Sequence, residues 1–110
     1  MTRRDILIGG ATVALIPLLG ARAAAAAPRV HNVVMANMRF APLPAGIKVG
    51  DVIVWVNRDV VPHTATVRDG SFNVDIPGRQ SRRMTVARAG TFAFYCRYHP
   101  AMRGTLVAAR

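Results

Sequence analysis

Residues 92–109 read FAFYCRYHPAMRGTLVAA, and this stretch decides the fold class because it begins with the alternation of a β-strand. Phe92, Phe94 and Cys96 fall on one face of a strand that starts at residue 91, since successive side chains point to opposite faces. We expect a loop over residues 97–103 and then a closing strand. The order of strand, loop and strand indicates a β-sheet protein.

The chain between residue 28 and this stretch continues the pattern of short β-prone runs between turn residues. Gly50-Asp51, Asp69-Gly70 and Pro77-Gly78 are typical of turns, and no helical stripe of useful length is present. We predict an all-β sandwich or barrel with about seven strands. The expected strands are residues 30–40, 52–57, 63–68, 71–76, 81–86, 91–96 and 104–109.

Large apolar side chains in these strands identify the expected core. A domain of this size buries only about 60–65% of the surface of its unfolded chain, so its core is small. The residues that we expect to form or flank the core are Trp55, Phe40, Phe72, Val52, Val54 and Leu106. Met35, Met38 and Met84 are expected there as well, because methionine fills irregular gaps between apolar side chains.

The first 27 residues have the order of an export signal: a basic start, an apolar run and a small-residue stretch, AAAAA. The pair Arg3-Arg4 is similar to a twin-arginine signal. The apolar run is short for a bilayer-spanning helix, which needs roughly 20 apolar residues. This disfavours the alternative, an uncleaved membrane anchor. We predict a cleavable signal peptide over residues 1–27 and a periplasmic domain over residues 28–110, without stable membrane insertion.

The predicted exported domain is strongly basic, with 12 Lys and Arg and 4 Asp, a formal charge of +8. Such a surface favours acidic partners and repels basic ones. Nucleic acid is an unfavourable partner, because the charges are scattered along the chain and export removes the protein from nucleic acid. We therefore expect acidic protein partners and a monomer.

One cysteine in an exported chain cannot form an internal disulfide, so its thiol needs burial or a bound partner. Cys96, His99 and Met102 follow one another at three-residue steps, so one loop can present all three. Two His, one Cys and a distant Met are the ligand set of blue-copper electron-transfer sites. His63 is the expected second histidine, at the mouth of a strand after a loop, and His31 is the weaker candidate.

Each of these residues alone has an ordinary interpretation. Cys96 could be an inert buried side chain, His99 a surface histidine and Met102 a core residue. Their common spacing, the upstream histidine and the all-β pattern together favour a metal site over three unrelated residues. We therefore predict one copper ion held by His63, Cys96, His99 and Met102.

Two stretches resemble the cupredoxin family, and specifically its amicyanin-like branch: YCRYHPAMRGTLV at residues 95–107 and VGDVIVWVNRDVVPHTATV at residues 49–67. The resemblance covers roughly residues 34–110. It implies a Greek-key β-sandwich, one copper ion and electron transfer in the periplasm. It also implies that the two histidines and the cysteine are strong ligands and that the methionine is a weak axial ligand.

The chain departs from this family pattern near the site. Thr64 stands where the family has Asn, whose implied role is to hold the two ligand loops together and to bond the cysteine sulfur. Thr64 still offers a backbone N–H and a hydroxyl. Tyr98 replaces a proline and adds an N–H; if that donor reaches the thiolate, the reduction potential should rise. Ala101 replaces an aromatic residue and thins the apolar contact surface.

These observations favour an electron carrier over its alternatives. We expect electrons to pass through the His99 edge, inside an apolar patch of Pro62, Pro100, Ala101 and Met102 with Arg97 and Arg103 at its rim. A periplasmic copper buffer or delivery protein is the main alternative, since the same ligands could serve it. A thiol enzyme lacks an orienting third group, and structural zinc sites seldom use Met. We therefore expect no enzymatic activity.

Overall fold

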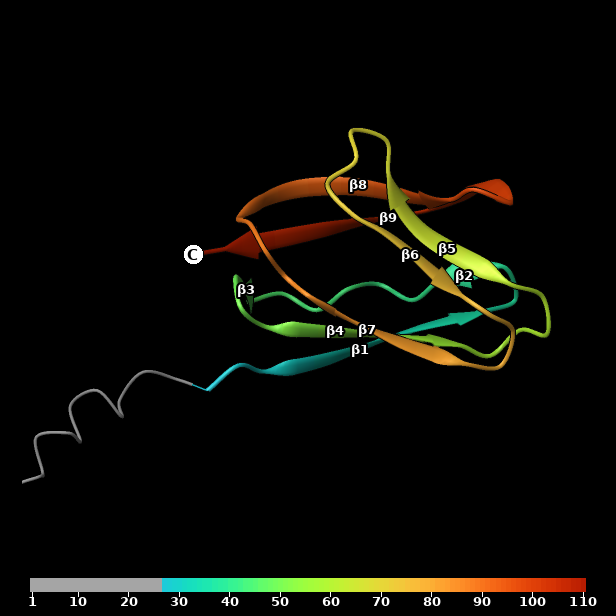
Figure 1. The fold of residues 1–110 in the computed structure, drawn as a ribbon, viewed down its shortest axis with the longest axis horizontal. Helices are drawn as coiled ribbons and strands as arrows, with labels where there is room; N and C mark the ends of the chain where they lie inside the picture. The colour runs from blue at the N-terminus through green and yellow to red at the C-terminus, as the bar shows by residue number, and fades with distance from the viewer. Residues whose placement is uncertain (1–26) are drawn as a thin grey trace, which may run out of the picture.

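The computed structural model describes residues 27–110, and its regular structure there consists of nine β-strands in two sheets (Figure 1). The predicted signal peptide lies outside the described residues except for Ala27. Within the described part of the chain, no helix is long and apolar enough to cross a bilayer. The all-β prediction is therefore confirmed for the domain.

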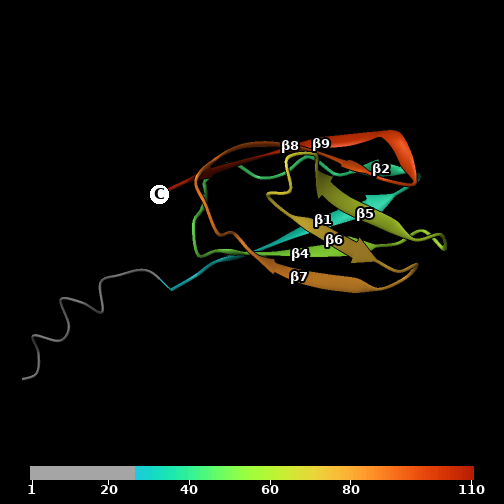
Figure 2. The same ribbon diagram turned by 45° about the horizontal axis from the view of Figure 1, so that its top comes forward.

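The two sheets pack face to face as the layers of a sandwich (Figure 2). The first sheet contains, in spatial order, β2 (Arg39–Phe40), β1 (Val30–Ala36), β4 (Val52–Asn57) and β7 (Ser81–Thr85). The second contains β3 (Ile47–Lys48), β9 (His99–Ala109), β8 (Gly90–Cys96), β5 (His63–Val67) and β6 (Asn73–Ile76). The β1–β4 and β3–β9 pairs are parallel, and the other pairs are antiparallel. The chain changes sheet at β2–β3, β3–β4, β4–β5, β6–β7 and β7–β8, in the manner of the expected Greek-key sandwich.

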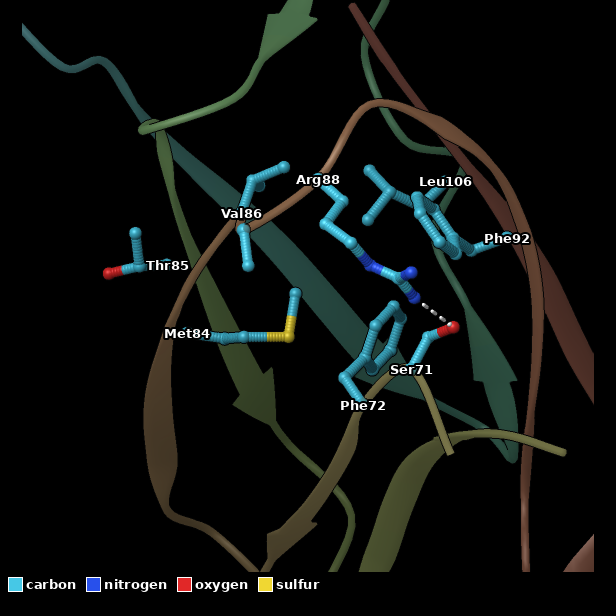
Figure 3. A pocket seen from close by; sticks show the side chains of 9 residues that line it. Ser71, Phe72, Met84, Thr85, Val86, Arg88, Phe92 and Leu106 are labelled. Carbon is cyan, nitrogen blue, oxygen red and sulfur yellow. Dashed lines mark hydrogen bonds between the residues drawn. The ribbon is translucent and has the colours of Figure 1, made fainter. Parts of the chain in front are cut away.

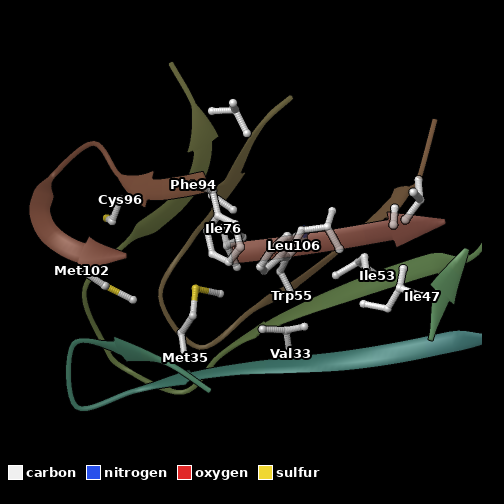
Figure 4. Close-up of a cluster of buried hydrophobic side chains, with 14 residues drawn as sticks. Val33, Met35, Ile47, Ile53, Trp55, Ile76, Phe94, Cys96, Met102 and Leu106 are labelled. Carbon is white, nitrogen blue, oxygen red and sulfur yellow. The ribbon is translucent and has the colours of Figure 1, made fainter. Parts of the chain in front are cut away.

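The core lies between the sheets and centres on Trp55, whose ring meets the ring of Phe94 edge-on at 5.2 Å (Figure 4). Trp55 and Leu106 are buried as predicted, and Phe40 and Phe72 flank the core as predicted. The prediction for Val52 and Val54 is wrong. Because β4 alternates, Ile53 and Trp55 point into the core, while the two valines are only half buried.

The predicted strand over residues 30–40 is interrupted by a tight turn at Asn37 and Met38. Both residues have positive φ, 54° and 62°, which is the conformation of a type I′ hairpin turn. β1 and β2 pair across this turn, Met35 with Phe40. Met38 is consequently 38% exposed rather than in the core, whereas Met35 is buried and Met84 packs against the core as predicted.

The predicted loop over residues 97–103 is also shorter than expected. β9 begins at His99, which pairs with Cys96, so only two residues form the turn between β8 and β9. A register shift at Tyr95/Cys96 leaves residues 100–102 of β9 without partners, so β9 carries a bulge directly after this turn. The prediction of about seven strands undercounts because β2 and β3 have only two residues each.

Asp51, the residue directly before β4, lies at the end of the sandwich where β1 begins. Its carboxylate accepts hydrogen bonds from the N–H groups of Arg29 and Lys48, each at 3.0 Å, and lies 2.9 Å from His31 Nε2. These bonds, that to His31 foremost, hold the pKa of Asp51 well below its usual range.

A small cavity of about 40 Å³ lies between the sheets, among Phe72, Met84, Phe92 and Leu106. The Arg88 side chain extends past these residues and donates to Ser71 Oγ at 2.9 Å (Figure 3). Phe92 begins the inward-facing row of β8 that ends at Cys96, so the cavity is separated from the thiol by most of the strand.

Asp51 gives the domain a specific acid sensitivity. Because its pKa is lower in the folded than in the unfolded chain, its stabilisation is present above about pH 4 and is lost as the pH falls below that value. We expect Asp51→Asn to lower the free energy of unfolding at pH 7 and to flatten its decline between about pH 4 and pH 2. Urea unfolding at a series of pH values measures both effects. Asn32→Ala, an exposed change in the same strand as His31, is the control; parallel pH curves for Asp51→Asn and wild type would contradict this role.

Candidate metal centre

Three chain connections meet at the end of the sandwich away from the chain's described N-terminal segment: the β8–β9 turn, the β4–β5 loop and the β1–β2 turn (Figure 1). They bring three of the predicted ligands, His63, Cys96 and His99, close to one another. His63 opens β5 and is 0% exposed, and Cys96 closes β8 and is 0% exposed. Met102 in β9 is buried, and His99 is half buried.

The separation of His63 and Cys96 is close to that of two ligands of one ion. His63 Nδ1 lies 3.7 Å from Cys96 Sγ. A nitrogen and a sulfur bound at about 2.0 and 2.3 Å to one tetrahedral ion lie about 3.5 Å apart. The separation therefore leaves room for a metal ion between the two atoms.

His99 lies next to this pair but is less closely arranged. Its ring centroid is 5.8 Å from that of His63, and the rings meet at 71°. The centroids of two imidazoles bound to one ion are at most about 6.3 Å apart, so this spacing is compatible with a shared ion. Within residues 27–110, however, no three His, Cys, Asp or Glu side chains are gathered in a position to hold a metal as they stand. The close pair is therefore His63 and Cys96, and the partly exposed His99 ring lies beside it.

The orientation of the His63 ring is set by Asp59 in the preceding loop. His63 Nε2 lies 2.8 Å from Asp59 Oδ2, which leaves Nδ1 facing the thiol. The carboxylate also accepts from the N–H groups of Asn37 and Met38 at 2.9 and 3.0 Å. These bonds, that to His63 foremost, lower the pKa of Asp59. A carboxylate on the far nitrogen fixes the tautomer and orientation of a ligand histidine.

The loop that carries Asp59 is itself held by buried Asn57. Its amide donates to the carbonyls of Val61 at 2.9 Å and Ile76 at 3.2 Å, and its oxygen accepts from Asp59 N at 2.9 Å. Gly78 passes so close that a Cβ there would lie 2.0 Å from Val60 O. The hydrogen bonds of buried Asn57 therefore hold the loop before His63 in place. The absence of a side chain at Gly78 allows the chain to pack closely against this loop.

Thr64 uses both its backbone N–H and its hydroxyl group, the two groups that the sequence indicated. Its backbone N–H lies 3.4 Å from Cys96 Sγ, and its hydroxyl oxygen accepts from Arg97 N at 2.9 Å. Among the described residues, Tyr98 N–H donates no hydrogen bond to the sulfur, so the expected additional donor from that position does not appear. Thr64 thus connects β5 to the turn that follows the cysteine.

The weaker candidate, His31, lies outside this group. It is bonded to Asp51 near the start of β1, four residues and about 13 Å of strand before Met35. Asp59 and Asn57 were not identified as site residues from the sequence, although both belong to the NRD run before His63. The hydrogen bonds that these two side chains form depend on the conformation of the loop, which the residue types alone do not specify.

The surface around His99 is apolar but differs from the expected patch. Pro62, Pro100 and Ala101 are exposed as expected, whereas Met102 is only 4% exposed and points inward. Other apolar side chains at this end are exposed: Met38 by 38%, Val60 by 70%, Val61 by 39% and Tyr98 by 52%. At the rim, Arg97 is paired with Asp75, so its charge is partly neutralised.

Comparison with known proteins shows similarity of sequence and of fold. The cupredoxin-like domain family matches residues 9–108. Amicyanin of Paracoccus denitrificans is 32% identical over 79 residues, which are 66% of this chain and 60% of that protein. Amicyanin-alpha of Methylorubrum extorquens is 28% identical over 82 residues, 69% of each chain. The chain spans only 58–60% of the length of the two Paracoccus amicyanins that it matches.

Solved structures extend the similarity to the fold. A reduced Cu(I) form of an amicyanin variant at pH 4 has a TM-score of 0.65 and 29% identity, covering 78% of this chain and 88% of that one. Amicyanin from Paracoccus versutus has a TM-score of 0.63 and 26% identity, covering 78% and 87%. The sandwich, the paired histidine and cysteine, and the family match over most of the sequence lead to one conclusion: the chain belongs to the cupredoxin-like family and is similar to amicyanins.

Proposed function

We propose that this protein is a periplasmic blue-copper protein that carries single electrons between redox partners. The observation that carries the proposal is the buried pair of His63 Nδ1 and Cys96 Sγ, 3.7 Å apart. A thiolate and an imidazole at that separation, with a thioether and a second imidazole nearby, suit copper better than zinc or a hard cation. His63, Cys96 and His99 would be the strong ligands, and Met102 the weak axial ligand.

Bound copper would supply a one-electron centre that alternates between Cu(II) and Cu(I), and the protein would hold its ligands nearly still. Three features of the chain support such rigidity. Asp59 fixes the His63 ring, Asn57 fixes the loop before it, and Thr64 ties β5 to the turn after Cys96. Ligands that move little reduce the reorganisation that accompanies each change of charge.

The path to a partner would run through His99, the one half-exposed member of the four proposed ligands. The exposed side chains of Val60, Val61 and Tyr98 surround this end and give a partner an apolar contact surface. Redox encounters of this kind are small in area and short-lived. The net positive charge of the domain would steer acidic partners toward it.

The remaining parts of the proposal concern cellular context. Residues 1–27 would direct export, with the twin-arginine pair as the transport signal, and the domain would act as a monomer. We assign it no enzymatic activity. A copper buffer or delivery role is the alternative, but ligands at 0% exposure, as His63 and Cys96 are, favour slow metal exchange.

The first test is the visible spectrum of the mature domain with Cu(II), before and after ascorbate. We expect an intense red-region band that disappears on reduction and returns on oxidation, because a copper–thiolate bond produces it. Cys96→Ser should abolish the band, while Met35→Leu, a buried change outside the ligand set, should keep it. A colourless wild-type protein, or one with only weak copper absorption, would refute the electron-carrier function and favour copper handling.

Asp59 should determine how well the site holds its metal. We expect Asp59→Ala to weaken copper binding by about 10- to 100-fold, because the His63 ring loses the partner that orients it. Competition with a chelator of known affinity measures the change. Asp69→Ala, at a turn outside the site, is the control. Equal affinities for the Asp59 and Asp69 variants would show that His63 does not need its carboxylate partner.

The apolar surface around His99 should control how fast two molecules of the protein exchange electrons. Two copies exchange electrons by docking at this surface, so Val60→Lys should slow self-exchange by about tenfold or more through like-charge repulsion. Val30→Lys is a matched control, because it adds the same charge at a residue 55% exposed near the opposite end. NMR line broadening in mixtures of oxidised and reduced protein measures the rate. Equal slowing by both variants would mean that net charge, and not this surface, limits the encounter.

A further inference from the structure

The backbone ladder between β5 and β8 stops before it reaches the metal centre. Thr66 pairs with Tyr95, and Val67 pairs with Phe94 one position further from the turn. Continuing this register toward the turn would place Thr64 opposite Arg97, where antiparallel strands can exchange backbone hydrogen bonds. Instead, Arg97 N donates to the Thr64 side-chain oxygen at 2.9 Å. A hydroxyl therefore replaces the backbone ladder directly after Cys96.

That hydroxyl is the first member of a chain of hydrogen bonds. Thr64 Oγ1 lies 2.9 Å from Thr66 Oγ1, and Thr66 Oγ1 lies 2.6 Å from Asn73 Oδ1 in the neighbouring strand β6. Thr64 is 0% exposed and Thr66 is 8% exposed, so the first two members are shielded from water. Asn73 is exposed and ends the chain at the surface.

Counting protons sets the direction of this chain. A backbone N–H only donates, so Arg97 uses a lone pair of the Thr64 oxygen. The Thr64 proton is buried and must have an acceptor, which is Thr66 Oγ1. Thr66 then donates its own proton to Asn73 Oδ1. The opposite direction, with the asparagine amide donating, would leave the Thr64 proton buried and unpaired.

We propose that Thr66 and Asn73 are positioning residues for the metal centre, acting through a one-way hydrogen-bond relay from Arg97 N–H through Thr64 and Thr66 to Asn73 Oδ1. The relay keeps the Thr64 oxygen turned toward Arg97 as an acceptor. Chains of hydrogen bonds that polarise one another are stronger than isolated bonds. Its consequence for the metal rests on the proposed copper function, whereas the relay itself is a property of the polypeptide.

The relay matters because the turn has few other bonds to β5. Thr64 also directs its N–H to Cys96 Sγ at 3.4 Å, and the turn connects that cysteine to His99. If Arg97 loses its acceptor, Cys96 and His99 can shift together relative to His63. The relay would thus fix the distance between ligands that come from different strands.

Amide hydrogen exchange in the metal-free protein tests the relay directly. We expect Thr66→Val to speed exchange at Arg97 N–H by about threefold to tenfold relative to the core amide of Leu106. Thr66→Ser keeps the hydroxyl and should restore the wild-type ratio. Thr105→Val, an exposed threonine on the same sheet, should not change it. A ratio unaffected by Thr66→Val would overturn the proposal, because ordinary packing loss accelerates both amides alike.

Asn73 tests the direction of the relay and is exposed, so its variants should fold even if Thr66→Val does not. Asn73→Asp keeps an acceptor at the end of the chain and should leave the exchange ratio near that of wild type. Asn73→Leu removes the acceptor and should raise the ratio as Thr66→Val does. If the Asp and Leu variants behave alike, the proposed direction, and with it the proposal, is wrong.

The copper-loaded protein provides the second measurement. The position of the visible band and the midpoint potential should shift in Thr66→Val, return in Thr66→Ser and stay constant in Thr105→Val; all three changes are neutral in charge. Shifts that Thr66→Ser fails to reverse would overturn the positioning role. A wild-type protein that stays colourless with copper would refute the proposed function, whereas an unchanged Arg97 amide would refute the relay, so the two failures are distinguishable.

Discussion

The contact between His63 and Cys96 is the constraint on which the other features of this end of the molecule depend. The two residues are 33 positions apart in the chain, yet Nδ1 and Sγ lie 3.7 Å apart in an interior closed to solvent. An imidazole and a thiol held at that distance are costly to bury without partners. The fold must therefore bring β5 and the end of β8 together and satisfy the polar atoms around them.

The polar atoms are satisfied on both sides of the contact. In the β4–β5 loop, the Asp59 carboxylate hydrogen-bonds His63 Nε2, and the Asn57 amide donates to the carbonyl of Val61. On the strand side, Thr64 directs its N–H to the sulfur and its hydroxyl to Arg97. The apolar core beneath supplies a fixed base, so the ligand geometry is set by the sandwich and not by the surface turns alone.

The fold class and the closeness of His63, Cys96 and His99 could be predicted from the sequence, because strand alternation and the chemistry of Cys and His are local properties. Other features could not. The run VIVWVN over residues 52–57 is apolar at five successive positions, so its alternation does not tell which face is buried. The turn at Asn37 and Met38 lacks the glycine that normally marks positive φ. In the sequence, Asp59 is indistinguishable from an ordinary loop carboxylate, because its contact with His63 depends on the folded conformation of the loop.

X-ray absorption spectroscopy of the copper-loaded domain in both oxidation states tests the central claim most directly. The claim is that the sandwich holds one thiolate and two imidazoles in place whatever the charge of the metal. We expect one sulfur and two nitrogen ligands in Cu(II) and in Cu(I), with nearly unchanged bond lengths at neutral pH. A reduced spectrum that lacks the sulfur, or an oxidised one with only nitrogen and oxygen ligands, would contradict the account.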